Sequence, residues 1–202
     1  MPVPARMIRD LGHAAVELAE KRGTGRRMRG YRAWLRATVR LSSPPRIAII
    51  GAGDGVEVRA ALLGIKSAAQ VPKGAEKVVF VLSHDAEDMR KAIRVQECCK
   101  VRRCRVRNEM WPCHEAVDVL VARRGSVWFD QVIVAPTANA AWAVEALKVL
   151  TPLFDTDTLV VLCRAWEGPM QQVARALAGR GWGGVDLGEV AALQRRGGPA
   201  EP

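Results

Sequence analysis

The sequence lacks an uninterrupted apolar run of about 18 residues, the length that crosses a bilayer as a helix, so no transmembrane segment is expected. It also lacks a secretory hydrophobic region at its N-terminus, which favours a reducing compartment. Its five cysteines include no Cys-x-x-Cys pair. These absences argue against a disulfide framework and favour free thiols over structural zinc, so no metal site is expected.

Histidine is also scarce. The chain has three, His13, His84 and His114, and they are isolated from one another in sequence. An isolated histidine is more often a surface or capping residue than a catalytic base. We therefore assign no catalytic residue from the sequence.

Acidic residues are few near the N-terminus, where positive charge concentrates. Residues 1–46 contain eleven Lys or Arg and three Asp or Glu, in a chain whose formal net charge is +10. The rest of the chain is therefore nearly neutral. This distribution predicts a basic N-terminal extension, residues 1–45, ahead of a folded domain.

The extension is predicted to contain two helices within residues 1–43, and the Ser-Ser-Pro-Pro sequence at 42–45 would end the second. Arginines line one face of that second helix and also precede it. Guanidinium groups in this arrangement suit phosphate contacts, so we predict a nucleic-acid-binding surface; an acidic protein or lipid surface and plain solubility are the alternatives. The arginines are Arg26, Arg27, Arg29, Arg32, Arg36 and Arg40.

A short apolar run at 46–50 breaks into three alternate glycines, Gly51, Gly53 and Gly55, and a helical pattern begins near Val56. This order predicts a strand, a tight turn and a helix start, the form of a nucleotide-type cradle. Glycine lets a ligand lie against bare backbone, and the helix start adds free N–H groups. The dinucleotide fingerprint would place its third small residue at Val56, so the spacing fits an S-adenosylmethionine (SAM) turn better. A turn with no ligand is the other interpretation.

Beyond residue 45, strand patterns alternate with helical ones. The predicted strands are 47–50, 78–82, 103–107, 131–135, 158–163 and 185–193, and the predicted helices are 56–63, 86–95, 114–122, 138–150 and 169–178. Such alternation predicts an α/β fold with a mostly parallel, twisted sheet and helices on both faces. We take residues 46–194 as this domain and 195–202 as a C-terminal tail.

From residue 46 to 190 the order of segments resembles the class I SAM-dependent methyltransferase family. Residues 47–55 are similar to its first motif, 79–92 to its second strand, acidic corner and helix, and 129–137 to its fourth motif. Residues 146–163 are similar to the helix, turn and fifth strand that follow. The resemblance implies a Rossmann-like methyltransferase fold: a seven-stranded sheet with a reversed last strand and SAM over the carboxyl ends of the first strands.

The resemblance also implies which positions bind SAM. The turn glycines would approach the methionine and ribose, a residue after the second strand would hold the ribose, and one of two residues near the third strand would contact the adenine. These residues are Gly51, Gly53, Gly55, Asp85, Asn108 and Glu109, with His84 as the alternative to Asp85.

Three positions depart from the family's pattern. Ile49 stands where the first strand usually carries an acid, the ribose position is ambiguous, and residues 135–137 replace the usual acid or amide before proline in the fourth motif. A charge-assisted hydrogen bond contributes roughly 1.5–3 kcal/mol, so losing two would weaken SAM binding about a hundredfold or more. We therefore predict a kept fold with weak or no catalysis, in which SAM is a possible cofactor whose binding is reduced or lost.

The sequence thus predicts a methyltransferase-like subunit that its basic extension docks into a ribonucleoprotein or another large assembly, with a mitochondrial ribosome-like particle as the specific expectation. One alternative is an active SAM-dependent RNA methyltransferase. Another is an accessory subunit of an organellar protein complex, with acidic protein instead of RNA as its partner. The expected location is mitochondrial, and the alternative is cytoplasmic.

Overall fold

The structure is a computed structural model, and it describes residues 46–53, 55–67, 77–99, 101, 104–124, 129–136, 138–154, 158–163, 168–180, 182–186 and 190–195. The two helices predicted within 1–43, the six arginines predicted to bind nucleic acid and residues 196–202 of the tail lie outside these ranges.

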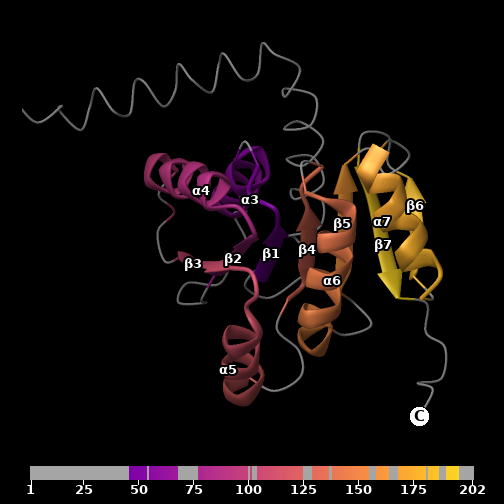
Figure 1. Cartoon of the computed structure of the whole chain (residues 1–202). Coiled ribbons are helices and arrows are strands. Elements are labelled where there is room, and N and C mark those ends of the chain that lie inside the picture. The colour runs from indigo at the N-terminus through magenta and orange to yellow at the C-terminus, as the bar shows by residue number, and fades with distance from the viewer. Residues whose placement is uncertain are drawn as a thin grey trace, which may run out of the picture.

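Within the described ranges, seven strands form one sheet in the order β3-β2-β1-β4-β5-β7-β6 (Figure 1). Strands β1 to β5 run parallel, whereas β7 runs antiparallel to both of its neighbours. The expected seven-stranded sheet with a reversed last strand is therefore confirmed. The strands are β1 (Arg46–Ile50), β2 (Lys77–Ser83), β3 (Cys104–Met110), β4 (Gln131–Val134), β5 (Leu159–Cys163), β6 (Trp182–Asp186) and β7 (Val190–Arg195).

One strand prediction was wrong. Residues 185–193 were expected to form a single strand, but they span the end of β6, a connection and the start of β7. The first half of β6 contains Gly183 and Gly184 in place of β-branched residues. Glycine weakens a strand pattern, so the sequence did not show β6 apart from β7, with which it pairs antiparallel.

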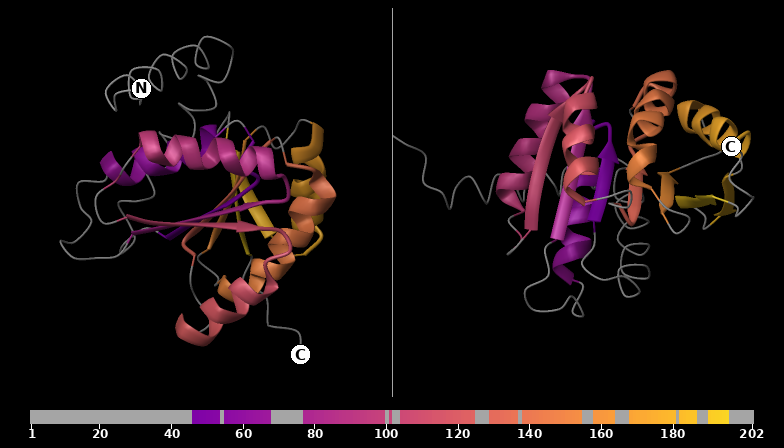
Figure 2. Two further views of the ribbon diagram at one scale, coloured as in Figure 1. Left: turned by 60° about the vertical axis from the view of Figure 1, so that its left-hand side comes forward. Right: turned by 90° about the horizontal axis from the view of Figure 1, so that it is seen from below.

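Helices cover both faces of the sheet, as the alternating pattern predicted (Figure 2). Helices α3 (Val56–Ser67) and α4 (Ala86–Cys98) lie on one face. The other face carries α5 (His114–Arg124), α6 (Ala140–Leu150) with the short 3₁₀ turn η2 (Thr151–Leu153), and α7 (Gly168–Ala178). In the described part of the chain, no helix is long and apolar enough to cross a bilayer.

The core forms two layers because successive strand residues point to opposite faces. Ile47 and Ile49 of β1 pack beneath α3 and α4, whereas Ala48 and Ile50 pack in the layer of α5, α6 and α7. β1 and β4 are buried almost throughout, and this explains why their sequences are continuous apolar runs.

The strand order reverses at β1, which pairs with β2 on one side and with β4 on the other. The chain leaves β1 into α3 on one face and leaves β4 into α6 on the opposite face. Open α/β sheets bind ligands outside the carboxyl ends of the strands at such a reversal. The carboxyl ends of the parallel strands β1, β2, β3 and β4 share one edge of the sheet, and a ligand-binding site is therefore expected at that edge.

Candidate functional site

The glycine turn after β1 has the predicted conformation. Gly51, Gly53 and Gly55 have φ angles of 83°, 45° and 79°, which are left-handed values, and all three are buried. The Gly51 N–H donates to the carbonyl of Leu82 at the end of β2 at 2.8 Å, and the Gly55 N–H donates to the carbonyl of Ala52 at 2.8 Å. Helix α3 then begins at Val56, so the turn and the N-terminus of α3 lie at the expected edge.

The protein's own packing accounts for two of these glycines. A Cβ atom at Gly51 would lie 2.9 Å from the Ala138 Cβ, and a Cβ atom at Gly55 would lie 2.7 Å from a methyl carbon of Val95. Real Cβ atoms essentially never come that close to another heavy atom. Packing and the left-handed φ thus favour glycine at both positions whether or not a ligand binds.

A carboxylate that the sequence analysis did not single out lies beside this turn. Glu57, in the first turn of α3, is 0% exposed. An acidic side chain is favourable at a helix N-terminus, where the helix dipole is positive. Because it is buried, however, a ligand could reach this carboxylate only after a rearrangement.

The acidic residue at the corner after β2, Asp85, has a structural role. Asp85 is the N-cap of α4, and its Oδ1 accepts hydrogen bonds from the N–H groups of Glu87 at 2.7 Å and Asp88 at 3.1 Å. Ser83 is buried, and its hydroxyl donates a hydrogen bond to the carbonyl of Asp85 and accepts one from the Asp85 N–H, each at 3.1 Å. The Asp85 carboxylate is exposed but is engaged by the start of its own helix.

Removal of that cap should give a pH-dependent loss of stability. The N–H groups of Asp88 and then Glu87 hold the pKa of Asp85 below its ordinary value. A carboxyl with a lowered folded-state pKa stabilises the protein above its unfolded pKa, and this contribution is lost as the pH falls through the folded-state pKa. The melting temperature of Asp85→Ala should therefore lie below that of the wild type at pH 7, and the gap should narrow below about pH 4.

The matched variant Asp85→Asn keeps a side-chain acceptor for the cap and should lose less at pH 7 than Asp85→Ala. Thermal unfolding followed by circular dichroism from pH 3 to pH 7 measures both variants. A gap between the wild type and Asp85→Ala that stays constant across this range would contradict the capping role.

Asn108 and Glu109 lie within β3, not beyond its end. The Asn108 and Gln96 amides exchange two hydrogen bonds, of 2.7 Å and 3.0 Å, between β3 and α4. Glu109 pairs with Arg107 at 2.5 Å on the same strand. Both side chains thus have partners inside the protein.

Asn139, in the loop after β4, has a structural role as well. The side chain of Asn139 is the N-cap of α6 and accepts a hydrogen bond from the Trp142 N–H at 3.2 Å.

An aromatic cluster joins the ends of β2 and β3 to α5 and α6. His84 stacks on Trp142 with ring centroids 4.4 Å apart, and Trp111 meets Trp142 edge to face at 6.2 Å and 90°. His114 lies 5.8 Å from Trp111. His84, the alternative to Asp85 at the ribose position, and His114 are isolated in the sequence, and nothing in the sequence brings these four rings together.

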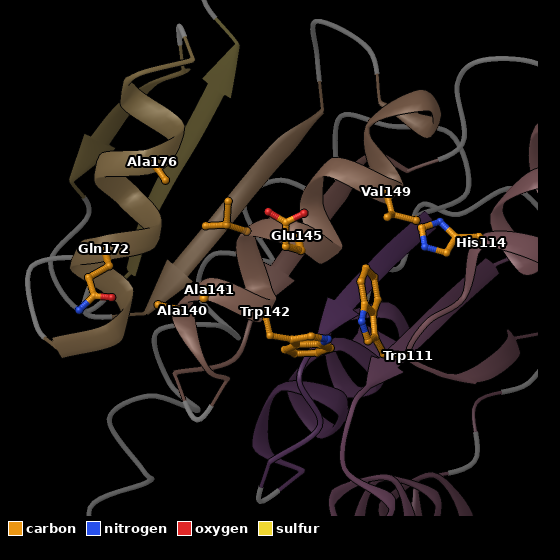
Figure 3. A pocket seen from close by; sticks show the side chains of 10 residues that line it. Trp111, His114, Ala140, Ala141, Trp142, Glu145, Val149, Gln172 and Ala176 are labelled. Atoms are coloured by element: carbon orange, nitrogen blue, oxygen red, sulfur yellow. The ribbon is translucent and has the colours of Figure 1, made fainter.

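The cluster borders a groove of about 670 Å³ along the outer side of α6 (Figure 3). Trp111 and His114 form one wall, Trp142 and Glu145 of α6 form the floor, and Gln172 of α7 lies at the far side. The lining is mainly apolar with a few polar groups, which is the usual composition of a small-molecule site.

A second groove, of about 520 Å³, adjoins the first at His114 and is lined by Arg107, Glu109, Cys113 and Glu115 among others. Burial, and then the neighbouring Glu109, raise the pKa of Cys113 to about 11. This thiol is therefore not a thiolate nucleophile at neutral pH. Within the ranges that the structure describes, no group of three or more His, Cys, Asp or Glu side chains could hold a metal ion.

Solved methyltransferase structures share this architecture. The O-methyltransferase from Bacillus cereus in complex with S-adenosylhomocysteine (SAH) is 13% identical, with a TM-score of 0.58 and coverage of 96% of this chain and 92% of that chain. The SAH-bound methyltransferase from Podospora anserina is 15% identical, with a TM-score of 0.52 and coverage of 98% of both chains. A protein from Corynebacterium glutamicum is 13% identical, with a TM-score of 0.60 and coverage of 100% and 94%. No family model matches the sequence, and no curated protein matches it.

The chain therefore has the fold of the class I SAM-dependent methyltransferases, as its resemblance to that family implied. At 13% to 15% identity the likeness establishes the fold, and the ligand must be judged from this chain's own residues.

These residues fit SAM in part. The glycine turn and the N-terminus of α3 provide the backbone geometry of an adenosyl site. Ribose hydroxyls and an ammonium group also need acceptors, and carboxylates are the strongest of these. Near the turn and the strand ends, however, Glu57 is buried, Asp85 caps α4 and Glu109 pairs with Arg107. Among these described carboxylates, that of Asp85 is the exposed one, and one of its oxygens is committed to the cap of α4.

Proposed function

We propose that this protein is a methyltransferase-like subunit with weak or no catalysis, docked by its basic N-terminal extension into a ribonucleoprotein. The observation that carries the proposal is the engagement of the site's polar groups in the fold itself. The carboxylate of Asp85 and the amide of Asn108 both stabilise helix α4, by capping and by pairing with Gln96. A fold that uses these groups internally retains its architecture and loses affinity for the cofactor.

The size of that loss follows from hydrogen-bond energies. Each charge-assisted hydrogen bond to SAM would contribute roughly 1.5–3 kcal/mol, so two missing bonds reduce affinity by about two orders of magnitude or more. Calorimetric titration with SAM and SAH tests the proposed loss of cofactor affinity.

The proposed docking into a ribonucleoprotein rests on the distribution of charge along the chain. Eleven of the chain's 31 Lys and Arg residues fall in residues 1–46, and only three of its 21 acidic residues do. Phosphate neutralisation by arginines releases counterions and makes binding strongly salt-dependent. A mitochondrial ribosome-like particle is the assembly that we propose, because it combines RNA with many protein subunits.

Binding of RNA should therefore weaken steeply with salt, and the slope should depend on the extension. Replacing Arg32 and Arg36 by Ala should reduce the slope of log K against log salt by about one unit per lost phosphate contact. Fluorescence anisotropy with a labelled single-stranded RNA between 50 and 300 mM salt measures the slope. Arg90→Ala, which removes an exposed arginine of α4 in the folded domain, should leave it unchanged. An unchanged slope in the Arg32/Arg36 variant would favour an acidic protein partner over RNA.

An active SAM-dependent RNA methyltransferase is the second candidate. The left-handed glycine turn, placed at the strand ends where α/β folds bind ligands, favours it. In that case Gly51, Gly53, Gly55 and Asp85 would contact SAM, and the arginines would hold the RNA.

A further inference from the structure

The groove beside α6 contains an aromatic corner. The indole rings of Trp111 and Trp142 stand at 90° with their centroids 6.2 Å apart, and both rings line the groove. Glu145, which like Trp142 comes from α6, lines the same groove as the two rings (Figure 3). Two perpendicular aromatic walls beside a carboxylate provide electron-rich ring faces and a full negative charge for one ligand.

The charged side chains near the Trp111–Trp142 corner favour a cationic ligand over an anionic one. The side chains lining this groove and the adjoining one include three carboxylates, of Glu109, Glu115 and Glu145, and one guanidinium, of Arg107. Arg107 is already paired with Glu109. Glu145 pairs with Lys148 in the same way. The described lining of the groove beside α6 contains no lysine or arginine, so a phosphate would find no cationic partner in that lining, whereas Glu145 can attract a positive group.

Glu145 remains available to such a ligand. Its partner is Lys148, one helical turn away, and the Glu145 and Lys148 side chains are 55% and 41% exposed. An exposed pair of this kind contributes little, so a bound cation could replace the lysine at low cost.

The apolar lining of the groove favours a methylated cation over a bare ammonium or guanidinium group. A bare ammonium or guanidinium group has several N–H donors that each need an acceptor once water is displaced. The groove's lining includes the apolar side chains of Ala140, Ala141, Val144 and Val149, and its polar side chains are those of His114, Glu145 and Gln172. Methyl groups on nitrogen remove donors, spread the charge and pack on indole faces, and aromatic cages recognise such ions.

We propose that this groove binds a methylated or quaternary ammonium group, with Trp111 and Trp142 supplying the ring faces and Glu145 the counter-charge. The site uses neither the glycine turn nor the N-terminal arginines, and its one link to the SAM proposal among the described residues is His84, the alternative ribose residue, whose ring contacts Trp142. Its volume of about 670 Å³ leaves room for a small free molecule or for the end of a methylated lysine side chain.

The test uses the full chain and two probes of the same shape, choline and its neutral analogue 3,3-dimethylbutanol. NMR titration should show choline shifting the indole N–H signals of Trp111 and Trp142, assigned through variants, with at least tenfold higher affinity than the neutral analogue. Equal affinities, or shifts that spare both indoles, would overturn the proposal.

Three variants locate the site. Trp111→Ala should weaken choline binding at least tenfold, whereas Trp111→Phe, which keeps a ring face, should weaken it less. Glu145→Gln should weaken choline about threefold or more and leave the neutral analogue unaffected. Because Glu145 is exposed on the outer side of α6, this variant is expected to fold, and equal choline binding by it would count against the proposal.

The source of the ammonium group is a second arm of the same experiment. Peptides carrying trimethyllysine and unmodified lysine are compared with choline. Tighter binding of the trimethyllysine peptide than of choline would identify a protein side chain as the ligand, and equal or weaker binding would identify a small free molecule. Equal binding of the two peptides, combined with no preference for choline over its neutral analogue, would exclude cation recognition.

Discussion

Gly51→Ala is expected to destabilise the protein by about 2–5 kcal/mol. A left-handed backbone costs a residue with a Cβ roughly 1–2 kcal/mol, and insertion of a methyl group into a packed core costs about 1–3 kcal/mol. Gly51 meets both conditions, because its φ is 83° and its new Cβ would lie 2.9 Å from the Ala138 Cβ. Denaturant unfolding of the two proteins measures the difference in free energy of unfolding.

The chain offers a matched control and a suppressor. Gly168 also has a left-handed φ, 48°, but nothing lies within 4 Å of a Cβ placed there, so Gly168→Ala should cost about 1 kcal/mol. The second-site change Ala138→Gly removes the clashing methyl group and should restore part of the stability lost by Gly51→Ala. Equal losses at Gly51 and Gly168 would show that contact with the loop after β4 does not shape the turn.

Phe80→Ala should cost about 3–5 kcal/mol, the usual range for removing a large ring from a core. Phe80 is fully buried in β2, between β3 and β1, and its ring lies 5.7 Å from that of Phe129, which precedes β4. Its loss leaves a cavity between the sheet and the layer of α5 to α7. The same unfolding experiment detects the loss as a lower denaturation midpoint.

Ile93→Ala is the control for Phe80→Ala. Ile93 lies on α4 and is 38% exposed, so truncation there should cost no more than about 1 kcal/mol. A cost at Phe80 as small as that at Ile93 would contradict the burial of Phe80 in the core between the sheet and α5 to α7.

Much of the fold could be predicted from local sequence. Strands buried on both faces must be continuous apolar runs, so residues 47–50 and 131–134 could be recognised without a structure. The turn glycines could be recognised too, since few other residues adopt left-handed angles. β6 could not, because its two glycines give no strand pattern.

The site was harder to predict, for a physical reason. An aspartate before a helix has the same sequence signature whether it caps that helix or holds a ribose, and only the geometry shows that Asp85 caps α4. Likewise, helical spacing does not reveal that Glu57 is buried, and the contacts of His84 and Trp111 with Trp142 join elements that are far apart in the chain. Such properties depend on tertiary packing.

The central claim is that a methyltransferase fold persists here while the polar groups of its cofactor site serve the fold. Isothermal titration of the full chain with SAM and with SAH tests it most directly. The SAH-binding Bacillus cereus O-methyltransferase, measured in the same buffer, is the positive control. We predict a dissociation constant weaker than about 0.1 mM for both ligands. Saturable binding at micromolar concentration would contradict the claim and favour an active enzyme.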